Sequence, residues 1–124
     1  MERAVSDIGQ IAITVSDVKT ALPYYRDVLG LQFLFSPAPQ LAFLAAGPVR
    51  IMLTTPQGAG AVGANSILYF KVSDIEAVHA AIVARGSASA EPPHLVAQMP
   101  DHQLWIGFLR DPDRNLVALM EEKR

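Results

Sequence analysis

The sequence predicts an α+β fold built from two consecutive modules, each with the element order βαβββ. Three observations lead to this prediction. A strand pattern passes directly into a helix pattern within residues 10–31, the same arrangement returns within residues 67–86, and three short strand patterns follow each helix. The dipeptide Ser-Asp marks the junction both times, at Ser16-Asp17 and 57 residues later at Ser73-Asp74. The chain therefore contains an internal duplication.

The first module opens with a strand and a helix. Apolar residues alternate with more polar ones over residues 10–15, which is the period of a strand with one buried face. Beyond Asp17 the apolar residues recur at helical spacing, so Asp17 is the predicted N-cap and Gly30 the left-handed residue that ends the helix. Pro23 lies inside this helix and removes one backbone hydrogen bond, so we expect a kinked or loosened first turn.

Three short strands complete the first module, which spans residues 8–55. They are predicted at residues 31–35, 41–46 and 49–54, with a break after the first at Ser36-Pro37-Ala38-Pro39. Residues 56–66 are rich in glycine and alanine and have no periodicity, which is typical of a flexible connection. We interpret them as the linker between the modules.

The second module spans residues 67–121 and repeats the order of the first. Its elements are predicted as a strand at 67–72, a helix at 74–85, and strands within 88–98, near 103–110 and at 115–121. The segment from Asp111 to Asn115 is a predicted turn in which Pro112 sets one backbone angle. The charged tail, residues 121–124, is expected to be solvated.

Composition limits the classes of function. A chain of 124 residues with 51% hydrophobic content predicts one domain, residues 1–124, with a substantial core. A formal charge of −2 with scattered basic residues argues against nucleic-acid binding. The chain has no cysteine, its start lacks the pattern of a signal peptide, and its apolar runs are too short to span a bilayer. We therefore expect a cytoplasmic protein with no membrane role.

The two tandem modules, the segment Tyr24-Tyr25-Arg26-Asp27-Val28-Leu29-Gly30-Leu31 and the turn from Asp111 to Asn115 resemble the vicinal-oxygen-chelate superfamily. Glyoxalases, bleomycin-resistance proteins and extradiol dioxygenases belong to it. The resemblance covers nearly the whole chain and implies a curved, half-open mixed β-barrel with the helices on the outside. Arg114 stands where the family usually has glycine, so we expect a non-glycine residue with positive φ in this turn.

The resemblance also implies four metal-ligand positions, on the first and last strand of each module. In this sequence they correspond to Gln10, Met52, Ile67 and Ala118. Of these four, only Gln10 carries an oxygen donor, whereas hard or borderline divalent cations need carboxylate oxygen or imidazole nitrogen. We therefore predict that the family's metal site is lost, and with it the Lewis acid for the family's usual chemistry, and we expect no other cofactor.

Strand alternation in phase with these four positions predicts the lining of a cavity. A lining of methionines, a tyrosine and a few polar groups is typical of a small-molecule pocket. A second interpretation stays open, in which the apolar residues are core filler and the cationic side chains only extend to solvent at strand ends. The predicted lining residues are Gln10, Ala12, Thr14, Arg50, Met52, Thr54, Ile67, Tyr69, Lys71, Leu116, Ala118 and Met120.

Two histidines are candidate catalytic residues. His94 and His102 begin consecutive predicted strands of the second module, so they could converge as cross-strand neighbours and act in proton transfer or hold a displaced metal. The alternative is that both are surface residues of the hairpin. His79 lies beside the apolar stripe of the second helix and is interpreted as a packed residue. Trp105 is either a stacking platform for a ligand or a core anchor.

Two functional hypotheses follow. The first is a protein that binds a small organic molecule, because bleomycin-resistance proteins share this fold without a metal. The second is an enzyme of the lyase, epimerase or dioxygenase type that uses His94 and His102, with Tyr69 or Lys71, either without metal or with a metal recruited by Gln10 at a displaced site. A homodimer is expected in both cases, because each module exposes a sheet edge that a small chain must cover.

Overall fold

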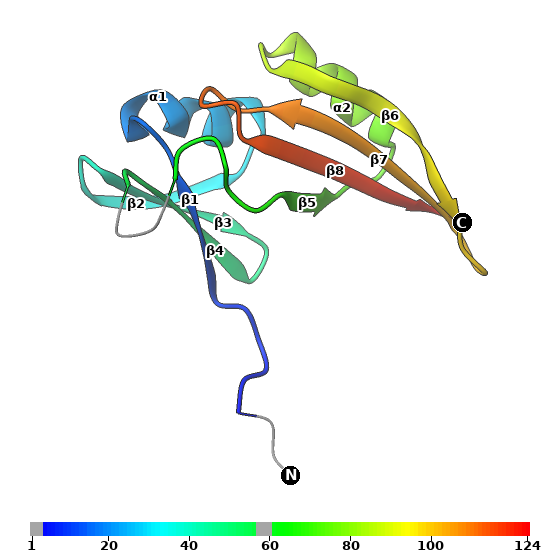
Figure 1. Ribbon diagram of the computed structural model, residues 1–124, viewed down its shortest axis with the longest axis horizontal. Helices are drawn as coiled ribbons and strands as arrows, with labels where there is room; N and C mark the ends of the chain where they lie inside the picture. Colours follow the sequence, from blue (N-terminus) through cyan, green and yellow to red (C-terminus); the bar gives the residue numbers. More distant parts are fainter. Residues whose placement is uncertain (1–3, 57–60) are drawn as a thin grey trace. The chain divides into compact units, whose positions relative to one another are not determined.

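The computed structural model describes residues 4–56 and 61–124, and the chain divides into two compact units, Met1–Gly60 and Ala61–Arg124. Each unit holds one four-stranded mixed sheet with a helix on one of its faces (Figure 1). The strand orders, β1-β4-β3-β2 and β5-β8-β7-β6, are equivalent once the second module is renumbered from its own first strand. The predicted α+β fold of two βαβββ modules is therefore confirmed. Part of the predicted linker, residues 57–60, lies outside the described residues.

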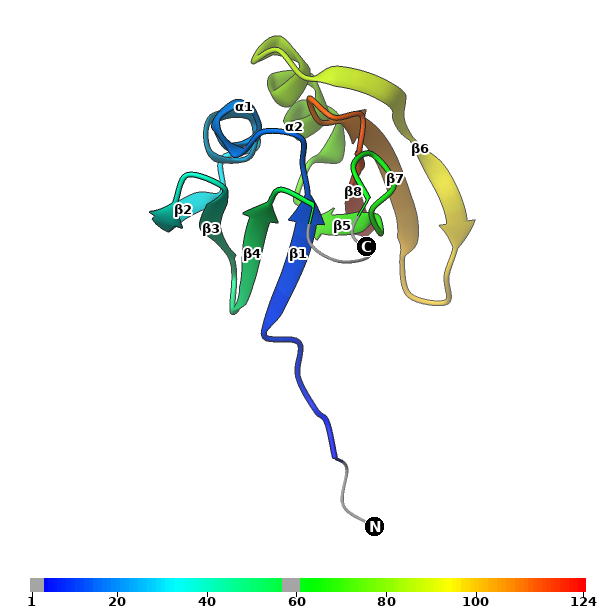
Figure 2. The same cartoon turned by 60° about the vertical axis from the view of Figure 1, so that its left-hand side comes forward.

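The first unit has the predicted element order. Its helix packs on β3 and β4, and Figure 2 shows the four strands side by side with this helix against one face. β1 pairs with β4 in parallel, and the other pairings are antiparallel. The elements are β1 (Gln10–Thr14), α1 (Val18–Pro23), the π-helical turn η1 (Tyr24–Val28), β2 (Gln32–Ala38), β3 (Leu41–Ala46) and β4 (Val49–Thr54).

Asp17 caps α1 as predicted. Its carboxylate accepts the Lys19 N–H at 3.1 Å and the Thr20 hydroxyl at 2.9 Å, which satisfies one of the free donors at the helix start. Asp17 itself is extended, with φ −151°. The junction between strand and helix is thus formed by local side-chain hydrogen bonds.

Pro23 loosens the helix, but in the turn after it and not in the first turn. The regular α-helix ends at Pro23, and the Leu29 N–H then donates to the carbonyl of Tyr24 at 2.9 Å, one residue farther back than in an α-helix. Pro23 has no N–H to offer the Lys19 carbonyl, so the helical ladder is already interrupted where the wider turn begins. Gly30, with φ +84°, ends the helix as predicted.

β2 extends farther than its predicted end at residue 35. The strand continues through Ser36 and Pro37 to Ala38, because β2 is an edge strand and a proline there need not remove a ladder hydrogen bond. A bulge interrupts its pairing with β3, so that Phe33 lies opposite Leu44 whereas Phe35 lies opposite Phe43. Phe33 and Phe35 therefore lie on opposite faces of the sheet.

The second unit repeats the architecture with its helix on β6, β7 and β8. Pro92 and Pro93 lie inside the edge strand β6, and a Cβ atom at Gly107 of the neighbouring strand would come within 3.2 Å of Pro93. Only glycine fits there without displacing the proline. The elements are β5 (Leu68–Lys71), α2 (Ile75–Ala84), β6 (Ala88–Gln98), β7 (Gln103–Arg110) and β8 (Leu116–Lys123).

The second Ser-Asp junction has a different backbone from the first. Asp74 has φ +57°, and Glu121 of β8 accepts both the Asp74 N–H at 3.0 Å and the Ile75 N–H at 2.9 Å. A carboxylate at a helix N-terminus is stabilising because it meets the free N–H groups and the positive end of the helix dipole. The prediction of a solvated tail is wrong, since β8 continues to Lys123 and Glu121 holds α2 in place.

The core of each unit lies between its sheet and its helix. Side chains alternate along a strand, so the residues between the core positions point to the opposite face of the sheet, which no helix among the described residues of the same unit covers. These helix-free faces carry the residues predicted to line the cavity. The fully or nearly fully buried core residues include Ile13, Ala42, Leu44, Ile51 and Leu53 in the first unit and Ile75, Ile82, Leu109, Val117 and Leu119 in the second.

The turn between β7 and β8 is built on the buried Asp111. Its carboxylate accepts the N–H groups of Asp113 at 2.9 Å and Asn115 at 2.8 Å, and the Asn115 side-chain amide at 2.9 Å. Arg114 has φ +69°, which confirms the prediction of a non-glycine residue in the left-handed region. The hydrogen bonds around Asp111 hold this conformation against its intrinsic cost.

Arg114→Gly should stabilise the protein by up to about 1.6 kcal/mol. The left-handed conformation costs a non-glycine residue roughly 1–2 kcal/mol, and the greater freedom of glycine in the unfolded chain offsets about 0.4–1 kcal/mol of the gain. Urea unfolding measures the difference. Asp113→Gly is the control, because this neighbour does not have a positive φ and should lose stability. An Arg114→Gly variant less stable than the parent would contradict the interpretation.

Candidate functional site

The predicted lining residues of the first unit share the helix-free face of its sheet. In the parallel pairing of β1 with β4, Gln10 lies opposite Arg50, Ala12 opposite Met52, and Thr14 opposite Thr54. Residues opposite one another point to the same face, so alternation in phase with the ligand positions that the resemblance implies grouped these six correctly. Thr14 and Thr54 are buried at one end of the face, whereas Gln10 and Arg50 are exposed at the other.

Gln10 is held by its neighbours on β4. The Arg50 Nε donates to Gln10 Oε1 at 2.7 Å, and Gln10 Nε2 lies 3.7 Å from the sulfur of Met52. The side-chain oxygen of Gln10 thus faces a guanidinium cation. This arrangement fixes Arg50 on the face and leaves the sheet with a positive charge there.

Two phenylalanines that the sequence reasoning missed complete this face. Phe43 of β3 lies opposite Met52, and Phe35 of β2 lies opposite Phe43 with the two rings stacked at 4.8 Å between centroids. The Arg50 Cζ lies 5.0 Å from the Phe43 centroid, within cation–π range. Alternation along residues 41–46 was sufficient to find Phe43. Phe35 depended on the bulge, which no sequence pattern indicated.

The corresponding face of the second unit is aromatic at its centre. Tyr69, Ala118 and Phe108 lie opposite one another on β5, β8 and β7, and the two rings meet edge to face at 6.1 Å. Tyr69 is 47% exposed, but Ala118 is fully buried. Lys71 lies opposite Met120 on the same face. Ala118 is in phase with the predicted lining but offers no open surface to a ligand.

A pocket of about 330 Å³ opens on this second face. It includes two predicted residues, Ile67 and Leu116, and four that the sequence reasoning missed. Arg110 is among the latter, and its Nη1 donates to the Arg114 carbonyl at 2.8 Å. The lining residues are Ile67, Ala90, Glu91, Phe108, Arg110 and Leu116. The pocket is therefore apolar with one acidic and one basic side chain.

The predicted convergence of His94 and His102 is wrong. His94 lies opposite Ile106, whereas His102 precedes β7 and its carbonyl accepts the Met99 N–H in the turn. The turn after β6 is tight, so a residue well inside β6 cannot meet one inside the turn. His94 contacts the carbonyl of its neighbour Pro92 at 2.9 Å and lies 3.9 Å from Glu91. Each histidine therefore has a separate environment.

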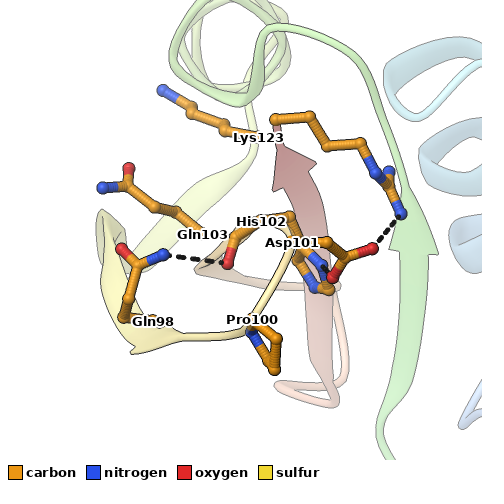
Figure 3. Close-up of a pocket in the computed structure, with 7 residues that line it drawn as sticks. Gln98, Pro100, Asp101, His102, Gln103 and Lys123 are labelled. Carbon is orange, nitrogen blue, oxygen red and sulfur yellow. Dashed lines mark hydrogen bonds and ion pairs between the residues drawn. The ribbon is translucent and has the colours of Figure 1, made fainter.

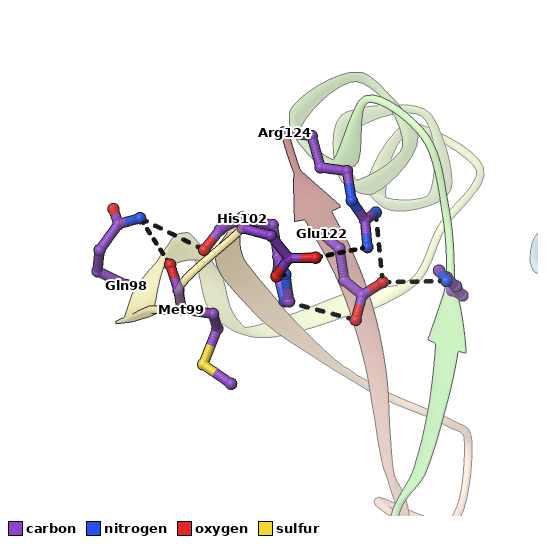
Figure 4. Close-up of polar contacts among 7 residues, drawn as sticks. Gln98, Met99, His102, Glu122 and Arg124 are labelled. Atoms are coloured by element: carbon purple, nitrogen blue, oxygen red, sulfur yellow. Dashed lines mark hydrogen bonds and ion pairs between the residues drawn. The ribbon is translucent and has the colours of Figure 1, made fainter.

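His102 lies in a network of charged side chains at one end of the second sheet (Figure 4). Its Nδ1 is 2.7 Å from Asp101 and its Nε2 is 3.5 Å from Glu122, while only 11% of its side chain is exposed. Lys71 pairs with Glu122 at 3.1 Å, and Arg124 lies within 3.6–3.7 Å of both carboxylates. The hydrogen bond with His102 lowers the pKa of Asp101, and the hydrogen bond from Lys71 lowers the pKa of Glu122.

A second pocket, of about 400 Å³, lies beside this network (Figure 3). The Gln98 amide donates to the His102 carbonyl at 3.4 Å, so this side of the pocket is part of the turn. Most of its lining is polar or charged. The residues are Gln98, Pro100, Asp101, His102, Gln103, Lys123 and Arg124.

Trp105 and His79 lie on the helix-covered side of the second sheet. Trp105 follows the alternation of the buried Gly107 and Leu109, so it does not share a face with Tyr69 and Ala118. Its indole N–H donates to Gln103 at 3.2 Å, and the Lys123 ammonium lies 4.3 Å from its ring centroid. His79 is buried with its Nε2 3.3 Å from the Ser89 hydroxyl, in line with the interpretation of a packed residue.

The four family ligand positions do not fit a divalent metal. In the first unit, the oxygen of Gln10 already accepts a hydrogen bond from the Arg50 cation, which would repel a metal ion, and Met52 offers only a thioether. In the second unit, Ile67 and the buried Ala118 carry no donor atom. Within residues 4–56 and 61–124, no three His, Asp or Glu side chains are grouped so that they could hold a metal.

Comparison with known proteins agrees with the fold and the duplicated modules. The sequence-family model of the Glyoxalase/Bleomycin resistance protein/Dioxygenase superfamily matches residues 7–119. The chain belongs to this superfamily. A relative, the uncharacterized protein YraH of Bacillus subtilis (strain 168), is 25% identical over 126 aligned residues, covering 89% of this chain and 94% of YraH.

Two solved structures of the superfamily fold illustrate its functional range. Lactoylglutathione lyase from Agrobacterium tumefaciens has a TM-score of 0.76 at 24% identity, covering 96% of both chains. TnmS3, an antibiotic binding protein from Streptomyces sp. CB03234, has a TM-score of 0.80 at 21% identity, covering 98% of this chain and all of TnmS3. At this level of identity the likeness shows the fold alone. Within the described part of the chain, no helix is long and apolar enough to cross a membrane.

Stability should fall in acid as the charged network titrates. The pKa values of Asp101 and Glu122 are lowered on folding from ordinary values of 3.8 and 4.5, so their contribution is complete above these values and is lost as the pH falls through the lower folded values. Lys71→Met should make this loss less steep, because Lys71 is the main cause of the shift at Glu122. The midpoints of urea unfolding between pH 7 and pH 2 measure this loss of stability in the parent and in the variant.

Lys19→Met is the matched control, since Lys19 lies on α1 of the other unit and its cation takes no part in this network. Its urea midpoint should fall with decreasing pH as steeply as that of the parent protein. Equal slopes for the parent and Lys71→Met would show that the ion pair has no influence on acid stability.

Proposed function

We propose that this protein binds a small organic molecule on the helix-free face of its sheets and that it does so without the family's metal ion. The observation that carries the proposal is the environment of Gln10. Gln10, which stands at the first ligand position that the resemblance implies, accepts a hydrogen bond from the Arg50 cation. The Arg50 guanidinium in turn lies over the ring of Phe43. A face arranged in this way is suited to holding an organic ligand and unsuited to holding a metal.

Exposed aromatic rings support the proposal. Phe35 and Tyr69 are each 47% exposed, one on each helix-free face, and both contact a second ring. Large exposed apolar groups that are gathered next to a few polar ones commonly mark ligand-binding surfaces. The pocket beside Phe108 has the volume of a small organic molecule and offers one acid and one base to orient it.

The relatives do not decide between binding and catalysis. TnmS3 binds an antibiotic and the Agrobacterium protein is a lyase, yet both share the fold of this chain. Function on a shared fold depends on the side chains of the site. The side chains at the four family ligand positions favour binding, because Met52, Ile67 and Ala118 replace the groups that metal-dependent catalysis would need.

One observation favours a second candidate, metal-free proton transfer by His102. A carboxylate oxygen 2.7 Å from Nδ1 orients the imidazole ring as in many acid–base sites, and a pocket adjoins the residue. The version of this hypothesis that paired His102 with His94 fails, because the two do not meet. The Nε2 of His102 faces Glu122 at 3.5 Å, so a substrate would have to compete with that contact.

Phe35→Ala should weaken binding of hydrophobic aromatic compounds about 3- to 30-fold, since it removes both a stacking partner and exposed apolar area. Compounds are first selected by the shift that they cause in the melting temperature of the parent, and their affinities are then measured by calorimetry. Phe33→Ala is the matched control, because the bulge places Phe33 on the opposite face of the same strand. Its affinities should stay within about twofold of the parent.

Two results would contradict the proposal. One is a broad panel of aromatic compounds in which none shifts the melting temperature of the parent. The other is an equal loss of affinity in Phe33→Ala and Phe35→Ala, which would place the ligand elsewhere.

We also propose a homodimer without bound metal in the cytoplasm. The edge strands β2 and β6 expose Leu34, Leu95 and Val96, and an apolar edge is usually covered by a partner. Native mass spectrometry of protein purified without chelators should show two 13.4 kDa chains and no metal. Stoichiometric zinc, nickel, iron or manganese would overturn the metal-free reading, and a stable monomer at micromolar concentration would overturn the dimer.

A further inference from the structure

We infer that the helix-free face of the first unit selects planar aromatic anions, such as aromatic carboxylates, with Arg50 binding the charge and the Phe35–Phe43 pair binding the ring. The inference rests on the proposed binding function and names the chemical class of its ligand. It concerns residues 4–56 alone.

Arg50 is a cation without a carboxylate partner among the described residues. Its side chain makes a hydrogen bond from Nε to Gln10 and a cation–π contact with Phe43. Other basic side chains are neutralised, for example Arg26 by Asp27 at 2.9 Å and Lys123 by Glu76 at 2.8 Å. According to the strand pairing, Arg50 is the only charged side chain among the described residues of β1 to β4 on the helix-free face. A ligand anion would supply the missing counter-charge.

The guanidinium is oriented before a ligand arrives. One N–H is bonded to the Gln10 oxygen at 2.7 Å, and Cζ lies 5.0 Å from the Phe43 ring centroid. These contacts use Nε and one face of the group, so the two terminal nitrogens have no hydrogen-bond partner among residues 4–56 and 61–124 and can bind a ligand. Their parallel N–H groups match the two oxygens of a carboxylate, which makes a bidentate ion pair.

The aromatic part of the ligand has a surface beside this cation. Phe35 stacks on Phe43 with 27° between the ring planes, and Phe35 is half exposed. Met52 is half-buried next to Phe43 and adds a flexible, polarizable contact. Ala12, opposite Met52, is small and leaves the face open. A flat ring can therefore lie on apolar surface while its carboxylate reaches Arg50.

The pocket beside Phe108 in the second unit differs in charge from the face that carries Arg50. Arg110 shares it with Glu91, and the Arg110 guanidinium already donates to the Arg114 carbonyl. An anion there would meet a carboxylate of like charge. Selectivity for anions is thus assigned to the face that carries Arg50.

The test compares 2-naphthoate with its neutral analogue 2-naphthamide by calorimetry at low ionic strength. The parent should bind naphthoate about 10-fold or more tightly than the amide, because hydrogen bonds to a charged group are the stronger ones. Arg50→Gln should remove most of this preference while changing amide affinity by less than about twofold. Lys19→Gln, which removes an exposed cation on α1 of the same unit, should leave both affinities unchanged.

The outcomes separate this inference from the proposed function. If both compounds bind equally and Arg50→Gln changes neither, the inference fails while binding itself stands. If neither compound binds and no other aromatic compound shifts the melting temperature, both fail. Should Arg50→Gln not fold, Arg50→Lys replaces it, since lysine keeps the charge without the planar fork. A loss confined to naphthoate supports the inference, and any other result overturns it.

Discussion

The parallel pairing of the first strand of each unit with its last strand determines what the rest of the structure can do. A parallel pair needs a crossover, and the helix of that crossover covers one face of the sheet. In the first unit α1 packs on β3 and β4, and in the second α2 packs on β6, β7 and β8. The other face of each sheet carries no helix of its own unit. The side chains available for ligand binding are therefore those that alternate away from the core.

The duplication preserves this constraint but not its details. Asp17 and Asp74 occupy equivalent junctions and both cap a helix, yet Asp17 is extended and Asp74 is left-handed. The difference follows from Glu121, whose carboxylate binds the N-terminus of α2 through two backbone N–H groups. The helix-free faces have diverged too. One carries a cation that has no carboxylate partner among the described residues and lies beside stacked rings, and the other has a pocket with both an acid and a base.

Membership of the superfamily does not assign an activity, because the same fold supports a lyase and an antibiotic-binding protein. In this chain the decisive features are side-chain substitutions. A thioether, two aliphatic groups and an amide hydrogen-bonded to arginine occupy the four positions that the resemblance equates with the family's metal ligands. Aromatic rings and Arg50 lie on the same surface as Gln10 and Met52, and this arrangement is the basis of our proposal that the chain recognises an organic molecule.

The sequence by itself determined the element order, most strand limits, the caps at Asp17 and Gly30, the strained Arg114, and the grouping of Gln10, Arg50 and Met52. The elements and caps are local properties, because strand period, helix period and turn chemistry depend on residues close in the chain. The expectation for Arg114 and the grouping of the three lining residues also used the resemblance to the superfamily. Only the tertiary structure decided the rest. The bulge that turns Phe35 toward Phe43, the hairpin that separates His94 from His102, and the return of Glu121 to α2 depend on pairing between distant segments, whose register a local pattern does not specify.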